Sequence, residues 1–546
     1  MRLRLALTGC LLATSAAADP LPFDVPSLHE EARTAGLDHS YSGPWEFFVG
    51  GGAASLDCNG DRRPDLLLAG GEGEAALFVN RAKVGGPLAF QRKALDLPER
   101  ERRRVLGAYP LDVDSDGNTD LFLLRLGGNV VLRGLGDCRF ERANRSWNLG
   151  GGRAWSTSFA AVWEKGARFP TLAVGNYVDR SAPGSPFGTC EPNVLLRPGS
   201  GAVPDYARAQ PLEPGHCALS ILFTDWAGTG EPSLRVSNDR QYHRGGQEQL
   251  WRVASGRPPR EYRASDGWRR LAIWGMGLAA HDMDGDGRPE IAMTSMGDTK
   301  LQRLTEEGVD AERPTYEDMA FARGATAHRP YAGGDHRPST GWHAQFADLN
   351  NDARTDLFIA KGNVESMSDF AAFDPDNLLL MKPDGTFRES GAEAGIARDT
   401  RGRGAVVEDF NMDGQLDLLV VNRGANVSLF RNRGAAVPWG HRPLGNWLAV
   451  DLDNGSVNRK GVGARLVVRT GNHVQTRTIR IGGGHASGQI GFTHFGLGAA
   501  ERATVRVRWP DGSWSHEYRV FAGNFVVLKR DAPQAAYWYP VDPPRP

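Results

Sequence analysis

D-V-D-S-D-G-N-T-D, at residues 112–120, is the stretch that decides the fold, because its spacing recurs along the chain. The recurrences are D-C-N-G-D-R-R-P-D from Asp57, D-M-D-G-D-G-R-P-E from Asp282, D-L-N-N-D-A-R-T-D from Asp348 and D-F-N-M-D-G-Q-L-D from Asp409. Two further copies keep little more than the frame, W-E-K-G-A-R-F-P-T from Trp163 and D-W-A-G-T-G-E-P-S from Asp225. The units lie roughly 50 to 65 residues apart, close to the repeat periods of β-propeller blades.

The segments around each loop predict four strands per unit. A strand of small and apolar residues enters the loop, as in G-M-G-L-A-A-H before Asp282, and an alternating strand such as E-I-A-M-T leaves it. A third apolar strand follows, and a fourth carries one aromatic residue at a regular place. Those aromatic residues are Phe90, Phe140, Tyr206, Tyr262, Tyr316 and Phe387. Four-stranded sheets repeated radially leave only short edges exposed, so we predict an all-β, seven-bladed β-propeller.

The seventh unit lacks a fourth strand of its own. Near the N-terminus, however, P-F-D-V around Phe23 precedes A-R-T-A-G ending at Gly36, much as Phe387 precedes A-E-A-G ending at Gly395. An unpaired last blade would leave backbone groups without partners at its edge. We therefore predict that residues near Phe23 pair with V-S-L-F-R near Phe430 and close the ring.

Each intact loop carries side-chain oxygens at positions one, three, five and nine, counted from its first Asp. Carboxylates about 4 Å apart repel by about 1 kcal/mol per pair in water, so such a cluster favours a cation. Calcium accepts six to eight oxygens in flexible geometry, whereas magnesium tolerates such crowding poorly. We predict about five Ca²⁺ sites. Their ligands are Asp57, Asn59, Asp61, Asp65, Asp112, Asp114, Asp116, Asp120, Asp282, Asp284, Asp286, Glu290, Asp348, Asn350, Asp352, Asp356, Asp409, Asn411, Asp413 and Asp417.

Ordinary turns are the competing interpretation, because Asp, Asn and Gly dominate turns without any metal. Five copies in one register between matching strands favour the metal. In the degenerate loop from Asp225, Ala227, Thr229 and Ser233 replace three ligands, and Trp163 removes the first ligand of the other loop. We predict no metal at these two loops.

The N-terminus has the pattern of an export signal, predicted over residues 1–18. Arg2 and Arg4 precede an apolar run, and a small-residue cleavage site ends at Ala18. The predicted location is therefore periplasmic or secreted. In an oxidising compartment, the four remaining cysteines favour two disulfides over a metal site, since no C-x-x-C spacing exists. Three connectivities are open, and we favour the sequential one, Cys58 with Cys138 and Cys190 with Cys217, because it closes the shortest loops.

The balanced charge argues against partners that would be attracted by a large net charge of the protein. The chain has 64 Lys plus Arg against 65 Asp plus Glu, which argues against nucleic acid as a partner. Beyond the signal, no stretch approaches the ~18 apolar residues of a membrane span. We expect a monomer that recognises a protein or glycan ligand at the cell surface or in the periplasm.

The repeats resemble the FG-GAP or VCBS repeats of integrin-α-type propellers, and the whole chain resembles the cartilage acidic protein family. The C-terminal resemblance is to the ASPIC and UnbV domain, and it rests on N-W-L-A-V-D-L, N-R-K-G-V-G-A-R-L-V-V, I-R-I-G-G-G, H-F-G-L-G from His494 and V-R-V-R-W-P-D-G-S-W ending at Trp514. The segment H-A-S-G-Q-I-G-F-T after Gly484 departs from the family pattern. The predicted domains are a propeller at 19–437, a small β-sandwich or barrel at 445–530 and a Pro-rich tail at 531–546. The resemblance implies extracellular, calcium-dependent binding, with no catalytic residues to transfer.

An enzyme is the alternative function, because propellers also host hydrolases and lyases. The histidines His281, His328, His336 and His343 are the candidates, and the 14 Trp could supply stacking platforms for a polysaccharide. Their spacing fits no metal-binding helix pattern, and the chain has no G-x-S-x-G or H-E-x-x-H motif. Ordinary strand and loop histidines are the simpler interpretation, so we predict no catalytic residues and favour a binding or scaffold protein.

Overall fold

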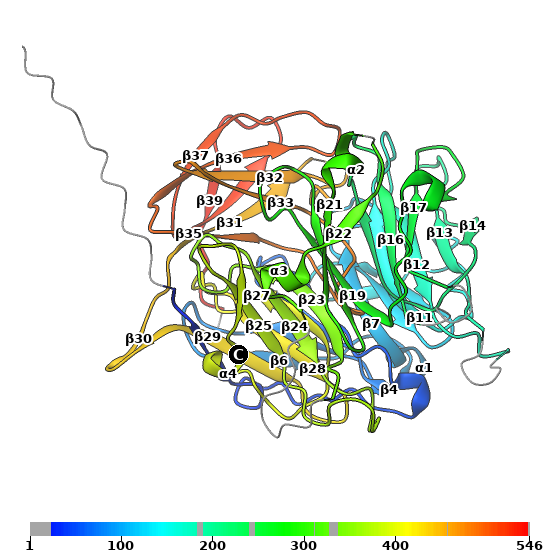
Figure 1. Ribbon diagram of the computed structural model, residues 1–546, viewed down its shortest axis with the longest axis horizontal. Coiled ribbons are helices and arrows are strands. Elements are labelled where there is room, and N and C mark those ends of the chain that lie inside the picture. Colours follow the sequence, from blue (N-terminus) through cyan, green and yellow to red (C-terminus); the bar gives the residue numbers. More distant parts are fainter. Residues whose placement is uncertain are drawn as a thin grey trace, which may run out of the picture.

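The computed structural model describes residues 23–182, 189–239, 246–310, 312–326, 337–455 and 457–543. These residues form an all-β structure in which seven sheets surround a common axis, and a C-terminal domain lies over one end of the ring (Figure 1). Within the described residues, no helix is both long and apolar enough to cross a membrane. The predicted signal segment and its cleavage site lie outside the described residues.

Each sheet of the ring contains four antiparallel strands ordered from the axis outward, and three of the sheets carry one further strand. The first contains β2 (Ala53–Leu56), β3 (Asp65–Leu68), β5 (Ala76–Asn80) and β6 (Phe90–Lys93). The second contains β7 (Arg103–Leu111), β8 (Asp120–Arg125), β9 (Val130–Gly134) and β10 (Phe140–Arg142), with β4 (Gly71–Glu74) added beside β7. The third contains β11 (Ser156–Val162), β12 (Thr171–Asn176), β13 (Asn193–Leu196) and β14 (Ala209–Leu212), and the fourth β15 (Ala218–Thr224), β16 (Ser233–Asn238), β17 (Gln249–Arg252) and β18 (Arg260–Glu261).

The other three sheets repeat this order. The fifth contains β19 (Gly275–His281), β20 (Glu290–Ser295), β21 (Lys300–Leu304) and β22 (Tyr316–Asp318), and the sixth β23 (Gly341–Ala347), β24 (Asp356–Lys361), β25 (Asn377–Met381) and β26 (Phe387–Glu389). The seventh contains β27 (Gly402–Glu408), β28 (Asp417–Asn422), β29 (Ser428–Val437) and β1 (Pro26–Glu30), and β30 (Gly440–Arg442) extends β29 as a hairpin. Short helices α1 (Glu99–Arg102), α2 (Glu306–Asp310), α3 (Ala320–Arg323) and α4 (Gly391–Ala394) lie in the connections.

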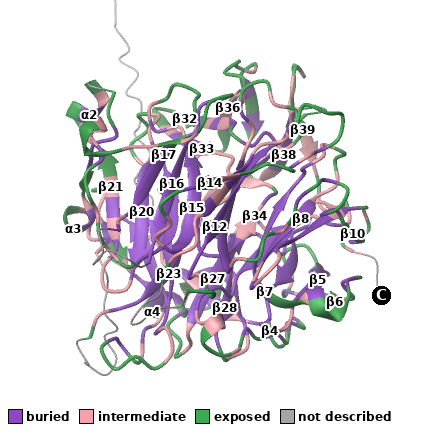
Figure 2. Ribbon diagram, turned by 90° about the vertical axis from the view of Figure 1, so that its right-hand side faces the viewer, coloured by how far each residue is buried: buried purple, intermediate pink, exposed green. Residues whose placement is uncertain are grey.

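The first strand of each sheet contacts the first strand of the next, and the contact between β2 and β27 closes the ring. These inner strands are rich in small residues, such as Ala53, Ala54 and Ala108, which allow seven backbones to approach one axis. They are almost wholly buried, whereas exposed residues gather in the outer connections (Figure 2). The predicted propeller architecture is therefore the observed one.

The predicted ring closure is confirmed, with a correction to its register. Strand β1 pairs antiparallel with β29, and Glu30 faces Phe430. Leu28, not Phe23, stands in the place of the aromatic residue, because it faces Asn432 as Phe90 faces Asn80 in the first sheet. Leu28 precedes Gly36 by the same spacing that separates Phe387 from Gly395. Phe23 instead packs against the core shared by the sixth and seventh sheets.

Each of these glycines fixes one sheet against the next. Gly36 has φ +84°, and a Cβ atom there would lie 2.6 Å from the carbonyl oxygen of Phe90. Gly395 has φ +92°, and its Cβ would lie 2.7 Å from the carbonyl oxygen of Leu28. The left-handed backbone and the close contact both require glycine, so the spacing from strand to glycine is a structural constant of the repeat.

Both predicted disulfides are present. Cys58–Cys138 joins the first sheet to the second with a Cα–Cα distance of 4.5 Å, and Cys190–Cys217 joins the third to the fourth at 5.0 Å. Because each bridge crosses between neighbouring sheets, it restrains the ring as well as its own loop.

The C-terminal domain is a sandwich of two four-stranded sheets. One contains β35 (Thr493–Gly498), β31 (Asn446–Asp453), β38 (Asn524–Lys529) and β39 (Ala536–Trp538), and the other β33 (His473–Thr478), β32 (Arg465–Thr470), β36 (Arg502–Arg508) and β37 (Tyr518–Phe521). Buried side chains from both sheets, including Leu448, Phe495 and Val505, form its core. The segment expected to be a Pro-rich tail contributes β39, which pairs with β38.

Candidate functional site

The five intact loops share one hydrogen-bonded frame. Each connects the first and second strands of its sheet, so that the position-nine carboxylate begins the second strand. That carboxylate accepts the N–H of position two in every intact loop; for example, Asp120 accepts the N–H of Val113 at 2.7 Å and the N–H of Gly134 at 2.8 Å. The carboxylate at position one accepts the N–H of position six, as Asp112 does from Gly117 at 3.0 Å. These bonds hold two of the four predicted ligands in place before any ion binds.

Two of the loops bring three carboxylates together. In one, oxygens of Asp112, Asp114 and Asp120 all lie within 4.8 Å of one another. In the other, the same holds for Asp282, Asp284 and Glu290. In addition, Oδ1 of Asp112 is buried and has no hydrogen-bond partner among the described residues. Hard oxygens at this separation, one of them unsatisfied, fit a divalent cation such as calcium.

Asn at position three makes the other three loops different. The side-chain amide of Asn59 donates to Asp61 at 3.1 Å, and Asn350 and Asn411 donate to Asp352 and Asp413 at 3.0 Å each. An amide can donate where a carboxylate can only accept, so these loops satisfy part of their own charge.

Arginines occupy some of the remaining oxygens. Arg133 donates to Asp114 at 2.6 Å and to Asp116 at 2.8 Å, and Arg354 donates to Asp352 at 2.6 Å. The predicted ligand Asp116 therefore faces Arg133 rather than the three-carboxylate cluster. Like Asp116, Asp286 stands apart from the cluster of its loop.

Burial sets the electrostatics of the loops. Desolvation, helped by neighbouring carboxylates, raises the pKa of Glu290 to about 8 and the pKa of Asp112 to about 6. The same causes raise the pKa of Asp417 well above its ordinary value. A bound divalent cation would reverse these shifts, because it stabilises the ionised form.

The two degenerate loops keep the turn but not the ligand set. Gly230 still donates to Asp225 at 2.8 Å, so the turn forms without the other acidic residues. In the loop from Trp163, Glu164 pairs with Arg197 at 2.6 Å and accepts the hydroxyl of Thr171 at 2.7 Å. The Arg197 guanidinium thus supplies the positive charge in a loop that lacks the metal ligands.

The connection from β33 to β35 enters the centre of the ring, and we call residues 479–492 the central plug. Strand β34 (Gly488–Gln489), within the plug, pairs parallel with β2. The Oγ atom of Ser487 accepts the N–H of Ala53 at 3.0 Å, and the carbonyl oxygen of Ala486 accepts the N–H of Ala108 at 3.2 Å. The plug also bonds to the third, fourth and fifth sheets through Ala161, Ile221 and Leu278, so one segment ties most of the ring together.

Two histidines that the sequence offered as catalytic candidates are engaged with the C-terminal domain. The N–H of His485 donates to Nδ1 of His343 at 3.1 Å, and burial lowers the pKa of His343 to about 4 and of His485 to about 3. Arg477 lies 3.1 Å from Nε2 of His281. His328 and His336 lie outside the described residues.

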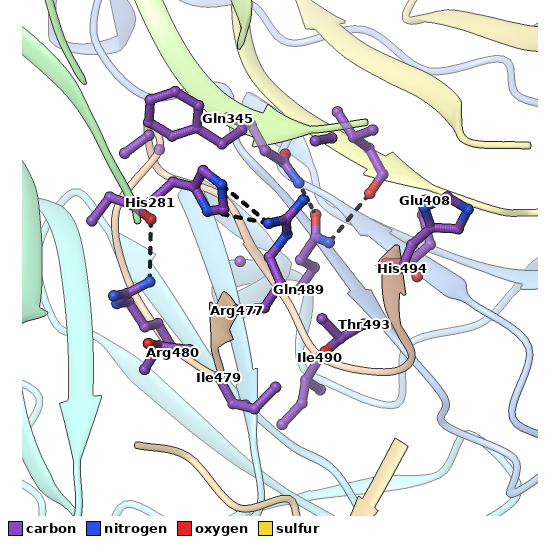
Figure 3. Close-up of a pocket in the computed structure, with 18 of the residues that line it drawn as sticks. His281, Gln345, Glu408, Arg477, Ile479, Arg480, Gln489, Ile490, Thr493 and His494 are labelled. Carbon is purple, nitrogen blue, oxygen red and sulfur yellow. Dashed lines mark hydrogen bonds between the residues drawn. The ribbon is translucent and has the colours of Figure 1, made fainter. Parts of the chain in front are cut away.

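A cavity of about 260 Å³ lies between the plug and the fifth, sixth and seventh sheets. Across it, Gln345 donates to Gln489 at 2.8 Å, and Gln489 donates to the carbonyl oxygen of Val407 at 3.2 Å (Figure 3). Glu408 also lines this cavity, and burial raises its pKa to about 8. The polar network joins plug to ring, and sequence reasoning missed it; the one available signal was the departure from the family pattern after Gly484.

The five intact loops all contact the C-terminal domain. The hydroxyl of Thr476 donates to Asp282 at 2.6 Å. Nε2 of His473 lies 2.8 Å from the carbonyl oxygen of Ala353, and Nε2 of His494 lies 3.1 Å from the carbonyl oxygen of Gly414. Arg62 pairs with Asp451, and the Arg459 guanidinium lies against Gly117. Among the described residues, neither degenerate loop forms a hydrogen bond to this domain. The intact loops therefore form the surface of the ring on which the C-terminal domain packs.

Comparison with known families agrees with this organisation. Residues 348–420, which hold two intact loops, match the FG-GAP-like repeat, and residues 454–535 match the ASPIC and UnbV domain. The protein is thus a β-propeller in which residues 348–420 match the FG-GAP-like repeat and the C-terminal residues 454–535 match the ASPIC and UnbV domain.

Along most of its length the chain is similar to cartilage acidic protein 1. It is 28% identical to the Mus musculus protein over 508 residues, 86% of this chain and 72% of that protein. It is 31% identical to the Homo sapiens protein over 174 residues, 30% of this chain and 24% of that protein. Among solved structures, BBS1N in complex with ARL6DN has a TM-score of 0.41 at 10% identity, covering 71% of this chain and 95% of that one. The Dos1 propeller has a TM-score of 0.37 at 9% identity, covering 78% and 99%.

Proposed function

We propose that this protein is an exported, calcium-binding β-propeller that acts as a binding or scaffold protein, and that calcium in its loops holds the C-terminal domain on the ring. Export is supported by the two disulfides, since disulfides persist in oxidising compartments. The ligand we propose is a protein or glycan of the cell surface or periplasm, bound by a monomer.

One observation carries the calcium assignment: two loops each hold three carboxylates within 4.8 Å of one another. Those carboxylates repel, and burial raises the pKa of Asp112, Asp120, Asp282 and Glu290, which increases the cost of ionising these four. Calcium, with its oxygen preference and flexible geometry, is the ion whose chemistry fits both the donors and their crowding. We expect dissociation constants of about 10⁻⁴ to 10⁻³ M or tighter, as in extracellular modules.

The scaffold role rests on where those loops lie. Thr476 of the C-terminal domain donates directly to Asp282, a proposed calcium ligand. Calcium that orders this loop would therefore also fix the contact with the C-terminal domain. A ligand that binds only the assembled form stabilises it by mass action, about 2.7 kcal/mol per site at a concentration of 100 times the dissociation constant. Calcium removal should therefore loosen the interface as well as the loops.

The test is calcium stoichiometry in matched variants. Equilibrium dialysis with elemental analysis should find about five calcium ions per chain in the wild type, and one fewer when Asp282→Asn and Glu290→Gln are combined. Asp225→Asn is the control, because Asp225 lies in a degenerate loop and holds the same turn. It should leave the count unchanged. A wild-type protein that binds no calcium at millimolar concentrations would refute the assignment.

A further inference from the structure

A second cavity, of about 360 Å³, lies between the two degenerate loops, the intact loop from Asp282 and the C-terminal domain. We call it the arginine cavity. Residues that line it include Trp163, Lys165, Thr229, Arg465, Arg480 and Arg508. Its volume is within the usual range for small-molecule sites, about 300 to 1,000 Å³.

The three arginines bring unneutralised positive charge into this cavity. Arg465 on β32 and Arg508 on β36 are direct cross-strand partners, an arrangement in which like charges destabilise a sheet. Arg480 follows β33 and lines the same cavity, and its guanidinium donates to the carbonyl oxygen of Ala280 at 3.1 Å. Within the described part of the chain, none of the three forms an ion pair. Burial, and then Arg465, lowers the pKa of Arg480 to about 10, so it stays charged at neutral pH.

The acidic residues that line the cavity are engaged elsewhere. Asp511 pairs with Arg530, and Glu231 pairs with Arg252 at 3.1 Å. Asp225 accepts the backbone N–H groups of Thr229 and Gly230, and Asp282 accepts those of its own loop and the hydroxyl of Thr476. The charge available to a ligand is therefore positive.

We infer that the arginine cavity binds an acidic saccharide, whose carboxylate or sulfate is received by Arg465, Arg480 and Arg508. Guanidinium groups bind such anions through paired, charge-assisted hydrogen bonds. Trp163 adds a half-buried indole to the wall, and its Nε1 atom is buried with no hydrogen-bond partner among the described residues. An aromatic surface beside charged donors suits a sugar ring, which has polar hydroxyl groups at its edge and an apolar face. This inference rests on the proposed role as a binding protein but requires no calcium at the degenerate loops.

The experiment is a calorimetric titration of the full-length protein with trigalacturonic acid, a sulfated disaccharide and, as the neutral counterpart, maltotriose. We expect saturable binding of one or both acidic sugars and none of maltotriose, and the preferred sugar identifies carboxylate or sulfate as the recognised group. Combining Arg465→Gln with Arg508→Gln should weaken binding about a hundredfold, roughly tenfold for each lost charged contact. Arg469→Gln is the matched control, since it lies on the same strand and sheet face but does not line the cavity.

Melting curves show whether the double variant folds. Because the substitutions remove a like-charge cross-strand pair, its unliganded melting temperature should equal or exceed that of the wild type. Wild-type affinity in this variant, or equal affinity for acidic and neutral sugars, would overturn the inference. So would binding of inorganic sulfate as tight as that of the sugars, since the cavity would then recognise only an anion. Calcium stoichiometry measured on the same preparation tells this failure apart from a failure of the calcium assignment.

Discussion

Substitution of Gly52 by Ala should displace the central plug while leaving the ring intact. A Cβ atom at Gly52 would lie 1.8 Å from the carbonyl oxygen of Ala486 and 2.9 Å from the Ala486 side chain. Gly52 lies outside the left-handed region, so alanine brings no backbone strain of its own. The three atoms nearest to that Cβ all belong to Ala486, so the main conflict is with the plug. The plug must move, because β2, which follows Gly52, is held in its sheet by β3.

The cost follows from the bonds that the plug would lose. The nearest are the 3.2 Å bond from the N–H of Ala108 to the carbonyl oxygen of Ala486 and the 3.0 Å bond from the N–H of Ala53 to Oγ of Ser487. Each buried group left without a partner costs about 1 to 3 kcal/mol. Losing both would therefore destabilise the docked plug by about 2 to 6 kcal/mol, enough to populate an undocked form measurably.

Hydrogen exchange by mass spectrometry is the assay. In Gly52→Ala, amides of residues 479–492 should lose protection, while the outer strands of the first sheet keep theirs. Gly150→Ala is the control, because no atom of the residues that the structure describes lies within 4 Å of a Cβ atom there. Unchanged exchange in the plug and an unchanged melting temperature in Gly52→Ala would refute the view that the plug is fixed by these close contacts.

Three further predictions concern the loops and the closure of the ring. Arg133→Gln should strengthen calcium binding at the loop from Asp112, because it removes the cation that pairs with Asp114; calorimetry showing weaker binding would contradict this. Without calcium, the protein should lose stability as the pH rises from about 5 to about 8. The folded-state pKa of Glu290, about 8, lies above its unfolded value, so the neutral form that stabilises the fold is lost over this range. Calcium should flatten this dependence, and a calcium-free melting temperature that rises from pH 5 to pH 8 would contradict the prediction. Leu28→Ala should cost about 2 to 5 kcal/mol in chemical denaturation, since Leu28 is buried in the closing strand, and a cost below 1 kcal/mol would mean that β1 is dispensable.

The repeats and the closing of the ring could be predicted from the sequence because the strand and loop patterns recur along the chain. The disulfides could be predicted because sequential pairing of the four cysteines closes the shortest loops. The exact closing residue was missed for a definite reason. Residue type pointed to Phe23, but the left-handed turn at Gly36 fixes the distance to the strand, and that distance selects Leu28. Leucine can fill an aromatic position in a packed core, whereas only glycine can adopt that turn against the Phe90 carbonyl oxygen.

The plug could not be predicted from local pattern. Its regular structure amounts to the two residues of β34, and its contacts join segments hundreds of positions apart, such as Ala53 with Ser487. Hydrophobic periodicity reports on the faces of helices and strands, and a strand of two residues is too short to show it. The difference between Asp and Asn at position three was visible in the sequence, but its consequence, donation to Asp61, Asp352 or Asp413, required coordinates.

The degenerate loops make physical sense once their surroundings are considered. The arginine cavity brings Arg465, Arg480 and Arg508 next to them, and a divalent cation in the loop from Trp163 would face this positive charge at short range. Loss of metal ligands there and presence of arginines opposite are therefore electrostatically consistent, as is the Arg197 partner of Glu164. The intact loop from Asp282 also lines this cavity, and there Asp282 accepts the hydroxyl of Thr476. All five intact loops, rich in carboxylates, meet the C-terminal domain directly. The same repeat thus serves two opposite purposes: five copies stay acidic and seat the domain, and the other two lose their acidic ligands beside a cavity that is left open to an anion.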